Sequence, residues 1–141
     1  KDGQTLTDTL TGLVWSREGG DPVYTSCSAK GPYTYQEALR YIACLNEKRF
    51  LGVTTWRLPN RNQLASLINR GRADSSIWLE DQGFRNIEAY WHWSSTSYAN
   101  VTWNAWTVNM HDGAIVPVAK KLRAYAWPVY TEPEAGPRHS P

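Results

Sequence analysis

Histidine is the side chain best suited to acid–base or metal chemistry near neutral pH, and this chain of 141 residues contains three of them. His92 lies between two tryptophans, His111 lies in a turn-forming segment, and His139 lies near the C-terminus. No two of them have the i,i+4 spacing of a helical zinc site, and no Glu stands beside them as in a metalloprotease. We therefore expect no metal site and no cofactor.

Carboxylates and serines could supply other kinds of catalysis. Asp74, Glu80 and Asp81 could in principle act as the paired acids of a glycosidase, but a solvated acidic loop explains them better. Ser94-Ser95 lacks the Gly-x-Ser-x-Gly elbow of a nucleophilic serine, so we expect a polar strand position that is hydrogen-bonded to the neighbouring loop. These arguments lead us to expect a protein that is not an enzyme.

Cys27 and Cys44 are the only cysteines, and neither has a His, Asp or Glu at the spacing of a zinc ligand. The remaining choices are a disulfide or two free thiols. We favour a disulfide that ties a polar loop to a helix.

The composition points towards recognition rather than electrostatic binding. Eight Trp and eight Tyr stand beside only two Phe, and amphipathic aromatics are favoured where a surface is partly buried and used for contact. Aromatic core packing explains most of the Trp equally well. The net charge is +2 without a block of like charges, which argues against nucleic-acid binding. No stretch approaches the roughly 20 apolar residues of a membrane span, so we expect no membrane insertion.

A predicted hairpin near residues 103–118 is the best candidate for a binding surface. Trp106, Val108 and Met110 alternate with Thr107 and Asn109, which is typical of a strand buried on one face. Asp112-Gly113 is a strong hairpin signal, and β-branched residues follow it. We expect an antiparallel hairpin whose outward face carries the function.

The rest of the chain supplies the elements that must position this hairpin. Thr34 and Glu37 form a capping box before an apolar repeat, which predicts a helix over about 35–48. Asn60 and Gln63 predict a second helix, ended by Gly71, and we expect a long structured loop over 70–89. The expected strands are 13–16, 55–58, 91–96, 103–110, 114–118 and 125–129. We expect one domain over 1–130, followed by a disordered tail over 131–141.

Several motifs occur in an order that resembles one known family. They are Thr11-Gly12-Leu13-Val14-Trp15, Glu37-Ala38-Leu39, Trp56-Arg57-Leu58-Pro59-Asn60-Arg61-Asn62-Gln63-Leu64, Trp93-Ser94-Ser95-Thr96, Ala105-Trp106-Thr107-Val108, Asp112-Gly113 and Trp127-Pro128-Val129. Over about residues 5–130 the chain resembles the bacterial and viral family named for the C-terminal domain of the Lcl collagen-like adhesin. The resemblance implies a C-type-lectin-like α+β fold: two helices, a small antiparallel sheet that joins the termini, and a second, loop-rich sheet that binds ligand.

The resemblance carries two functional settings. Some members look like the variable proteins of diversity-generating retroelements, and others look like surface adhesins that bind sulfated glycans. The calcium site of C-type lectins is not expected, because Trp103-Asn104-Ala105 lacks the Asp that completes the usual Trp-Asn-Asp ligand motif. Cys27 and Cys44 also cannot be mapped onto the paired active-site cysteines of the formylglycine-generating enzymes, which are similar in fold.

We expect the protein to be extracellular, on a cell surface or on a virion, and to bind a surface protein with variable side chains on a rigid scaffold. The residues assigned to the binding face are Tyr98, Asn100, Thr102, Trp103, Asn104, Thr107, Asn109, His111, Ala114, Val116 and Val118. The residues assigned to the scaffold are Trp15, Trp56, Trp93, Trp106 and Trp127. The alternative ligand is a sulfated polysaccharide, bound by Lys120, Lys121 and Arg123, with Arg61, Arg70 and Arg72 as further cations.

Overall fold

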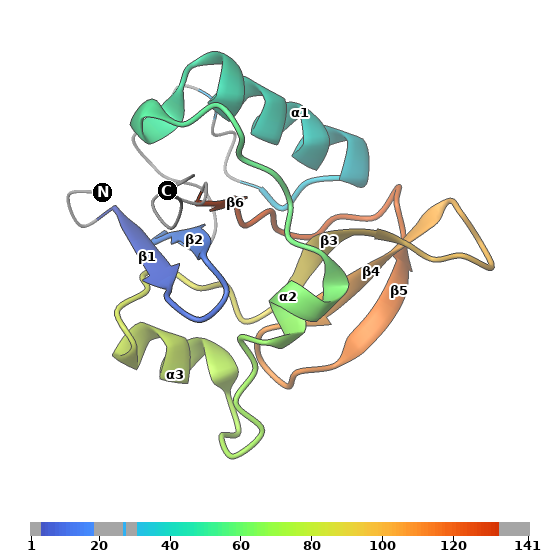
Figure 1. Ribbon diagram of the computed structural model, residues 1–141. Coiled ribbons are helices and arrows are strands. Elements are labelled where there is room, and N and C mark those ends of the chain that lie inside the picture. The colour runs from blue at the N-terminus through green and yellow to red at the C-terminus, as the bar shows by residue number, and fades with distance from the viewer. Residues whose placement is uncertain (1–3, 19–26, 28–30, 133–141) are drawn as a thin grey trace, which may run out of the picture.

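Two antiparallel sheets organise the computed structural model, which describes residues 4–18, 27 and 31–132 (Figure 1). The first sheet, in the order β1-β2-β6, contains β1 (Thr5–Asp8), β2 (Leu13–Ser16) and β6 (Val129–Thr131). The second sheet, in the order β3-β4-β5, contains β3 (Trp91–Ser97), β4 (Asn104–Asn109) and β5 (Ile115–Ala119). The first sheet pairs the beginning of the described chain with its end. Together with three α-helices, these sheets confirm the α+β class.

The first helix, α1 (Tyr35–Glu47), begins at the capping box that the sequence predicts. The Thr34 side chain accepts a hydrogen bond from the Glu37 amide, and the Glu37 carboxylate accepts one from the Thr34 amide. Its buried stripe includes Ala38 and Leu45, and it packs into the same core as the second sheet. The predicted helix over 35–48 is therefore confirmed.

The segment after α1 differs from the prediction in two places. A 3₁₀ turn, η1 (Phe50–Gly52), follows α1, and the second helix, α2 (Arg61–Ala65), starts at the predicted Asn60 cap but ends well before Gly71. The predicted loop over 70–89 contains a third helix, α3 (Ser75–Asp81), which begins where Asp74 accepts a hydrogen bond from the Ser76 amide. These helices are short, so tertiary contacts determine their length more than local periodicity does.

The observed strands differ from the predicted ones in three places. The segment 55–58 forms no strand; Arg57 makes one isolated bridge, to Val129. The strand predicted over 125–129 is observed as β6, which starts at Val129 and includes Thr131, a residue that we had placed in the tail. Strand β1 lies in a segment for which the sequence predicts no strand. Residues 133–141, the rest of the predicted tail, lie outside the described residues.

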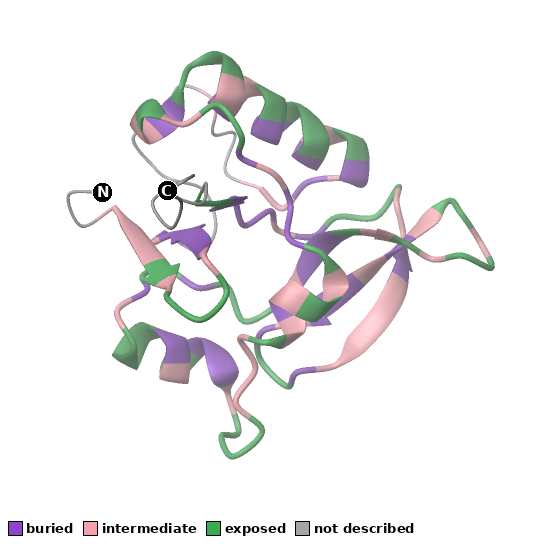
Figure 2. Cartoon of the chain, viewed as in Figure 1, coloured by how far each residue is buried: buried purple, intermediate pink, exposed green. Residues whose placement is uncertain are grey.

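The core consists of two clusters, and the strand register places their second-sheet residues on opposite faces of that sheet. Figure 2 shows buried residues on β2, along the second sheet and on one side of α1. Trp93 belongs to the first cluster with α1, and Trp127 belongs to the second with residues of α2 and α3. Trp15 and Trp56 are also buried, as a scaffold role requires, whereas Trp106 is only half-buried. The favoured Cys27–Cys44 disulfide is present, with the two Cα atoms 5.8 Å apart. Within the part of the chain that the structure describes, no helix is long and apolar enough to cross a membrane.

Candidate functional site

The second sheet does not have the open outward face that the sequence predicts. Thr107 pairs with Trp93 on one side and with Val116 on the other, so these three side chains share one face, the face of the first core cluster. Thr107 is fully buried, and its hydroxyl donates a 3.0 Å hydrogen bond to the Val116 carbonyl. Val118 is also buried. Assigning Thr107 and Val118 to the binding face was therefore wrong, because both faces of the sheet are covered at these positions.

The side chain of Trp106 points to the other face and lies at the edge of the covered region. The guanidinium carbon of Arg61 lies 4.5 Å from the centre of its ring system, and the Tyr98 ring meets it edge-on at 5.4 Å. Trp106, which the sequence analysis assigns to the scaffold, is thus a half-buried support for a surface cluster.

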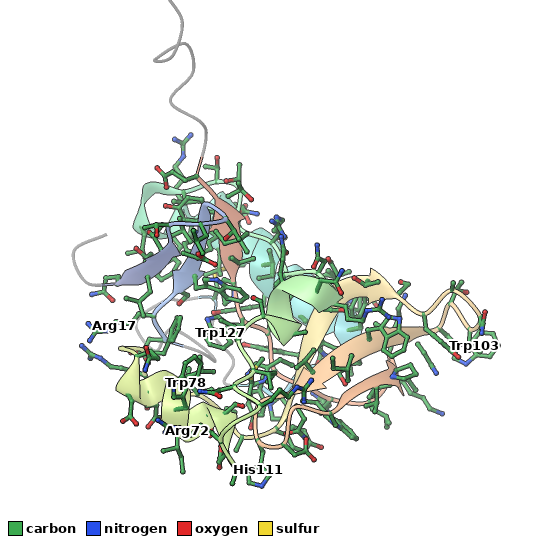
Figure 3. All side chains as sticks on the ribbon, turned by 60° about the horizontal axis from the view of Figure 1, so that its bottom comes forward. Arg17, Arg72, Trp78, Trp103, His111 and Trp127 are labelled. Atoms are coloured by element: carbon green, nitrogen blue, oxygen red, sulfur yellow. A yellow bond between two sulfur atoms is a disulfide. The ribbon has the colours of Figure 1, made fainter. Side chains whose placement is uncertain are left out.

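The most exposed aromatic side chain of the sheet lies in the connection between β3 and β4. We call residues 98–104 the tip. Its backbone is fixed by hydrogen bonds: the Tyr98 amide donates to Asn104, the Asn104 amide donates to Val101, and the Trp103 carbonyl accepts from Lys120. The Trp103 side chain is nonetheless 72% exposed, and Figure 3 shows it at the far end of the hairpin. The tip therefore combines an ordered backbone with an aromatic side chain that the core does not use.

Three of the remaining predicted contact residues, Asn109, His111 and Ala114, lie at the opposite end of β4 or in the turn before β5. His111 Nδ1 lies 2.9 Å from Asp74 Oδ2, and the Asn109 side chain accepts a hydrogen bond from the His111 amide. The Ser76 hydroxyl, with a smaller contribution from His111, holds the pKa of Asp74 below its usual value, while partial burial opposes the shift. The six residues of β4 span roughly 17 Å, and Figure 3 shows His111 and Trp103 well apart. The predicted face is thus two separate surfaces.

The binding-face residues can now be sorted by position. Those at the tip are Tyr98, Asn100, Thr102, Trp103 and Asn104. Those at the β4–β5 turn are Asn109, His111 and Ala114. Val116 is half-buried against the first core cluster. Of these groups, only the first contains an exposed aromatic side chain, Trp103.

Gly113 lets the β4–β5 turn pack closely against the loop before α3. Its φ is +78°, and an added Cβ would lie 2.8 Å from Ile68 Cγ2 and still closer to the Arg70 guanidinium. We predict that Gly113→Ala lowers the free energy of unfolding by about 2 kcal/mol, measured by urea denaturation. Gly12→Ala is the matched control, because Gly12 has a φ of +77° with open space around it. Equal losses in the two variants would contradict the close approach.

The cations proposed for a sulfated ligand are spread over the molecule. Arg123 Nη1 lies 2.8 Å from Glu37 Oε1, and Lys120 donates to the Ser97 hydroxyl while lying 4.8 Å above the Tyr35 ring. Lys121 is exposed beside them. Arg70 lies at the far turn, where it donates to the Gly113 carbonyl, and Arg72 is exposed in the loop before α3. The six basic residues therefore do not form one cluster.

The pairing of Arg61 with Trp106 is the feature that the sequence analysis missed as a site. No periodic signal links the two residues, because α2 and β4 are far apart in the sequence. Among the described residues there is no group of three His, Cys, Asp or Glu side chains that could hold a metal ion. The Ser94 hydroxyl donates a 2.7 Å hydrogen bond to the Trp106 carbonyl, so Ser94 has a structural role, but its partner is the neighbouring strand β4 and not a loop.

Comparison with known proteins agrees with this architecture. The family model described as the Lcl C-terminal domain matches residues 4–130, which is nearly the whole described chain. A search of curated proteins found no match. The match covers both sheets and all three helices. The chain therefore belongs to the Lcl C-terminal domain family.

Proposed function

We propose that this is a non-enzymatic binding domain that recognises a protein on a cell surface through the tip, residues 98–104. Membership of the Lcl C-terminal domain family supports a binding role, and the C-type-lectin-like scaffold is part of the proposal. The observation that carries it is Trp103, 72% exposed on a hydrogen-bonded hairpin. Large aromatic side chains of this kind dominate the energetics of protein interfaces.

The arrangement of the tip also supports the proposal that its side chains vary, as in the variable proteins of diversity-generating retroelements. Asn100, Thr102 and Trp103 are exposed, and none of them belongs to either core cluster. Their backbone is held by main-chain hydrogen bonds, which do not depend on side-chain identity. Substitutions there would change the partner at little cost in stability. The disulfide fits an extracellular, cell-surface or virion location.

Replacing the Trp103 indole tests the proposal directly. We expect Trp103→Ser to weaken binding to peptides selected from a random phage-displayed library by at least about 30-fold, with an unchanged melting temperature. The control is Leu10→Ser, since Leu10 is 94% exposed in the β1–β2 turn, away from the tip. Equal binding by the wild type and Trp103→Ser would contradict recognition by the tip.

A sulfated polysaccharide remains the second candidate, supported by the exposed Lys121 beside Lys120. A charge-driven complex weakens steeply with ionic strength, whereas an aromatic interface does not. Retention on a heparin column that is lost with added salt and in Lys120→Ala/Lys121→Ala would favour this candidate over the tip.

A further inference from the structure

Arg61 extends the aromatic surface of the tip with a fixed positive charge. Its guanidinium lies 4.5 Å from the Trp106 ring centre, and Trp106 contacts the Tyr98 ring. The Arg61 amide donates a 3.0 Å hydrogen bond to the Thr96 hydroxyl, which anchors the start of α2 to β3. Arg61, Trp106 and Tyr98 thus form a continuous strip that leads into the tip.

The guanidinium of Arg61 differs from those that stabilise the fold. Arg57 donates to the Gln63 side-chain oxygen, and Arg123 pairs with Glu37. No residue that the structure describes forms an ion pair or hydrogen bond with the guanidinium of Arg61. Stacking on an indole leaves the in-plane N–H groups free, and they form a planar fork that matches a carboxylate. The Trp106 ring therefore holds the Arg61 guanidinium in place while its N–H groups stay available to a ligand.

Lys120, another cation beside the tip, lies on the opposite side of the sheet from this fork. Lys120 lies over Tyr35, whose ring packs edge-on against Trp93. Trp93 pairs with Thr107, so it lies on the face of the sheet opposite to Trp106. The strip therefore carries a single free cation among aromatic groups. That arrangement suits one carboxylate within an apolar protein surface better than the repeated charges of a polysaccharide.

We propose that Arg61 binds a carboxylate of the protein ligand, an Asp or Glu side chain whose apolar neighbours contact Trp103 and Tyr98. The inference rests on the proposed function and specifies what the partner must carry. It makes Arg61 a determinant of specificity, because a partner that lacks the acid would leave the fork unpaired while its apolar contacts remained.

The test is a double-mutant cycle on peptides selected from a random phage-displayed library with the wild-type domain. Each acidic peptide is synthesised also with its Asp or Glu replaced by Asn or Gln. The dissociation constants of both forms are measured for the wild type, Arg61→Gln, Arg61→Lys and Arg72→Gln. Arg72→Gln is the matched control, because Arg72 is exposed away from the strip and the loss of charge is the same. Melting temperatures verify that each variant is folded.

We expect the amide peptides to bind the wild type and Arg72→Gln about tenfold more weakly than the acidic peptides. Arg61→Gln should bind both forms with equal, weak affinity, and Arg61→Lys should restore only part of the difference because its charge is not a planar fork. The inference is overturned if the selection yields no acidic peptides. It is also overturned if replacing the peptide acid by its amide weakens binding as much in Arg61→Gln as in the wild type. Heparin binding that is lost in Arg61→Gln overturns it too, in favour of sulfate.

The two proposals fail in different ways. If Trp103→Ser abolishes binding but the Arg61 variants show no coupling to the peptide acid, recognition by the tip is supported and the carboxylate site is wrong. If the coupling persists and Trp103→Ser binds normally, the carboxylate site stands and recognition by the tip falls. Absence of any selected peptide counts against both.

Discussion

Acidification is expected to destabilise this domain through His92, a buried histidine at the junction of the second sheet and the second core cluster. The side chain is fully buried, with the rings of Tyr125 and Trp127 each 5.8 Å away. Burial lowers the pKa of the imidazole from 6.5 to about 4, against a smaller opposing effect of its hydrogen bond to the Tyr90 carbonyl. Nδ1 lies 3.0 Å from that carbonyl and must donate to it, while Nε2 has no partner among the described residues.

The sign of the effect follows from proton binding. Between the two pKa values the unfolded chain binds a proton at His92 and the folded domain does not, so the free energy of unfolding falls as the pH falls. The contribution of His92 to stability is fully present above pH 6.5, the pKa in the unfolded chain, and is lost as the pH falls towards 4, the pKa in the folded domain. The whole pKa shift corresponds to about 3 kcal/mol in the free energy of unfolding. About 2 kcal/mol of it is lost when the pH falls from 7 to 4.5. Urea denaturation at a series of pH values measures it.

His92→Asn is the control for this prediction. Its amide can still donate to the Tyr90 carbonyl, but it does not titrate in this range. The variant has a lower baseline stability from lost packing, so the comparison is of pH slopes rather than of absolute values. The pKa values of Glu37 and Asp74 are also lowered, and their contribution appears at more acidic pH and is common to both proteins. Identical slopes above pH 4.5 would refute the role of His92.

The elements that the sequence predicted well are those whose signals are local. The start of α1 depends on Thr34 and Glu37, which are three residues apart, and its buried stripe repeats within a few turns. The turn at Gly113 was also predicted from a local signal, the Asp112-Gly113 pair, and its φ is +78°; the approach of Ile68 and Arg70, which also requires glycine there, is not local in the sequence. Helix α3 has a clear cap at Asp74, but its seven residues are too few to show a period.

The faces of the second sheet show where local reasoning stops. Alternation along β4 separates Thr107 from Trp106, but it does not show which face is covered. Here each face packs on a different core cluster, and Thr107 tolerates full burial because its hydroxyl donates to Val116 in the next strand. A polar residue in an alternating strand is therefore evidence about register and not about exposure.

The candidate site divides in the same way. Trp103 was assigned to the binding face and is exposed, but it lies in the connection before β4 and not in the strand predicted over 103–110. The contribution of Arg61 could not be predicted, because the position of its side chain depends on α2 lying against β3 and β4. The separation of Trp103 from His111 follows simply from strand length, since the two ends of an extended strand cannot contribute to one compact contact.

Reduction of the disulfide is expected to cost about 3 kcal/mol of unfolding free energy. Cys27 and Cys44 are 17 residues apart in the sequence, and a cross-link over a loop of this length removes conformational entropy from the unfolded chain. Urea denaturation with and without a phosphine reductant measures the loss. A Cys27→Ser/Cys44→Ser variant should have the same free energy of unfolding as the reduced protein, and the reductant should not change it. Full reduction is verified by thiol titration. If the urea midpoint of the fully reduced protein is unchanged, the prediction is wrong. At urea concentrations below the unfolding transition, the reduced protein should still bind through Trp103, because the hydrogen bonds of the tip involve neither cysteine.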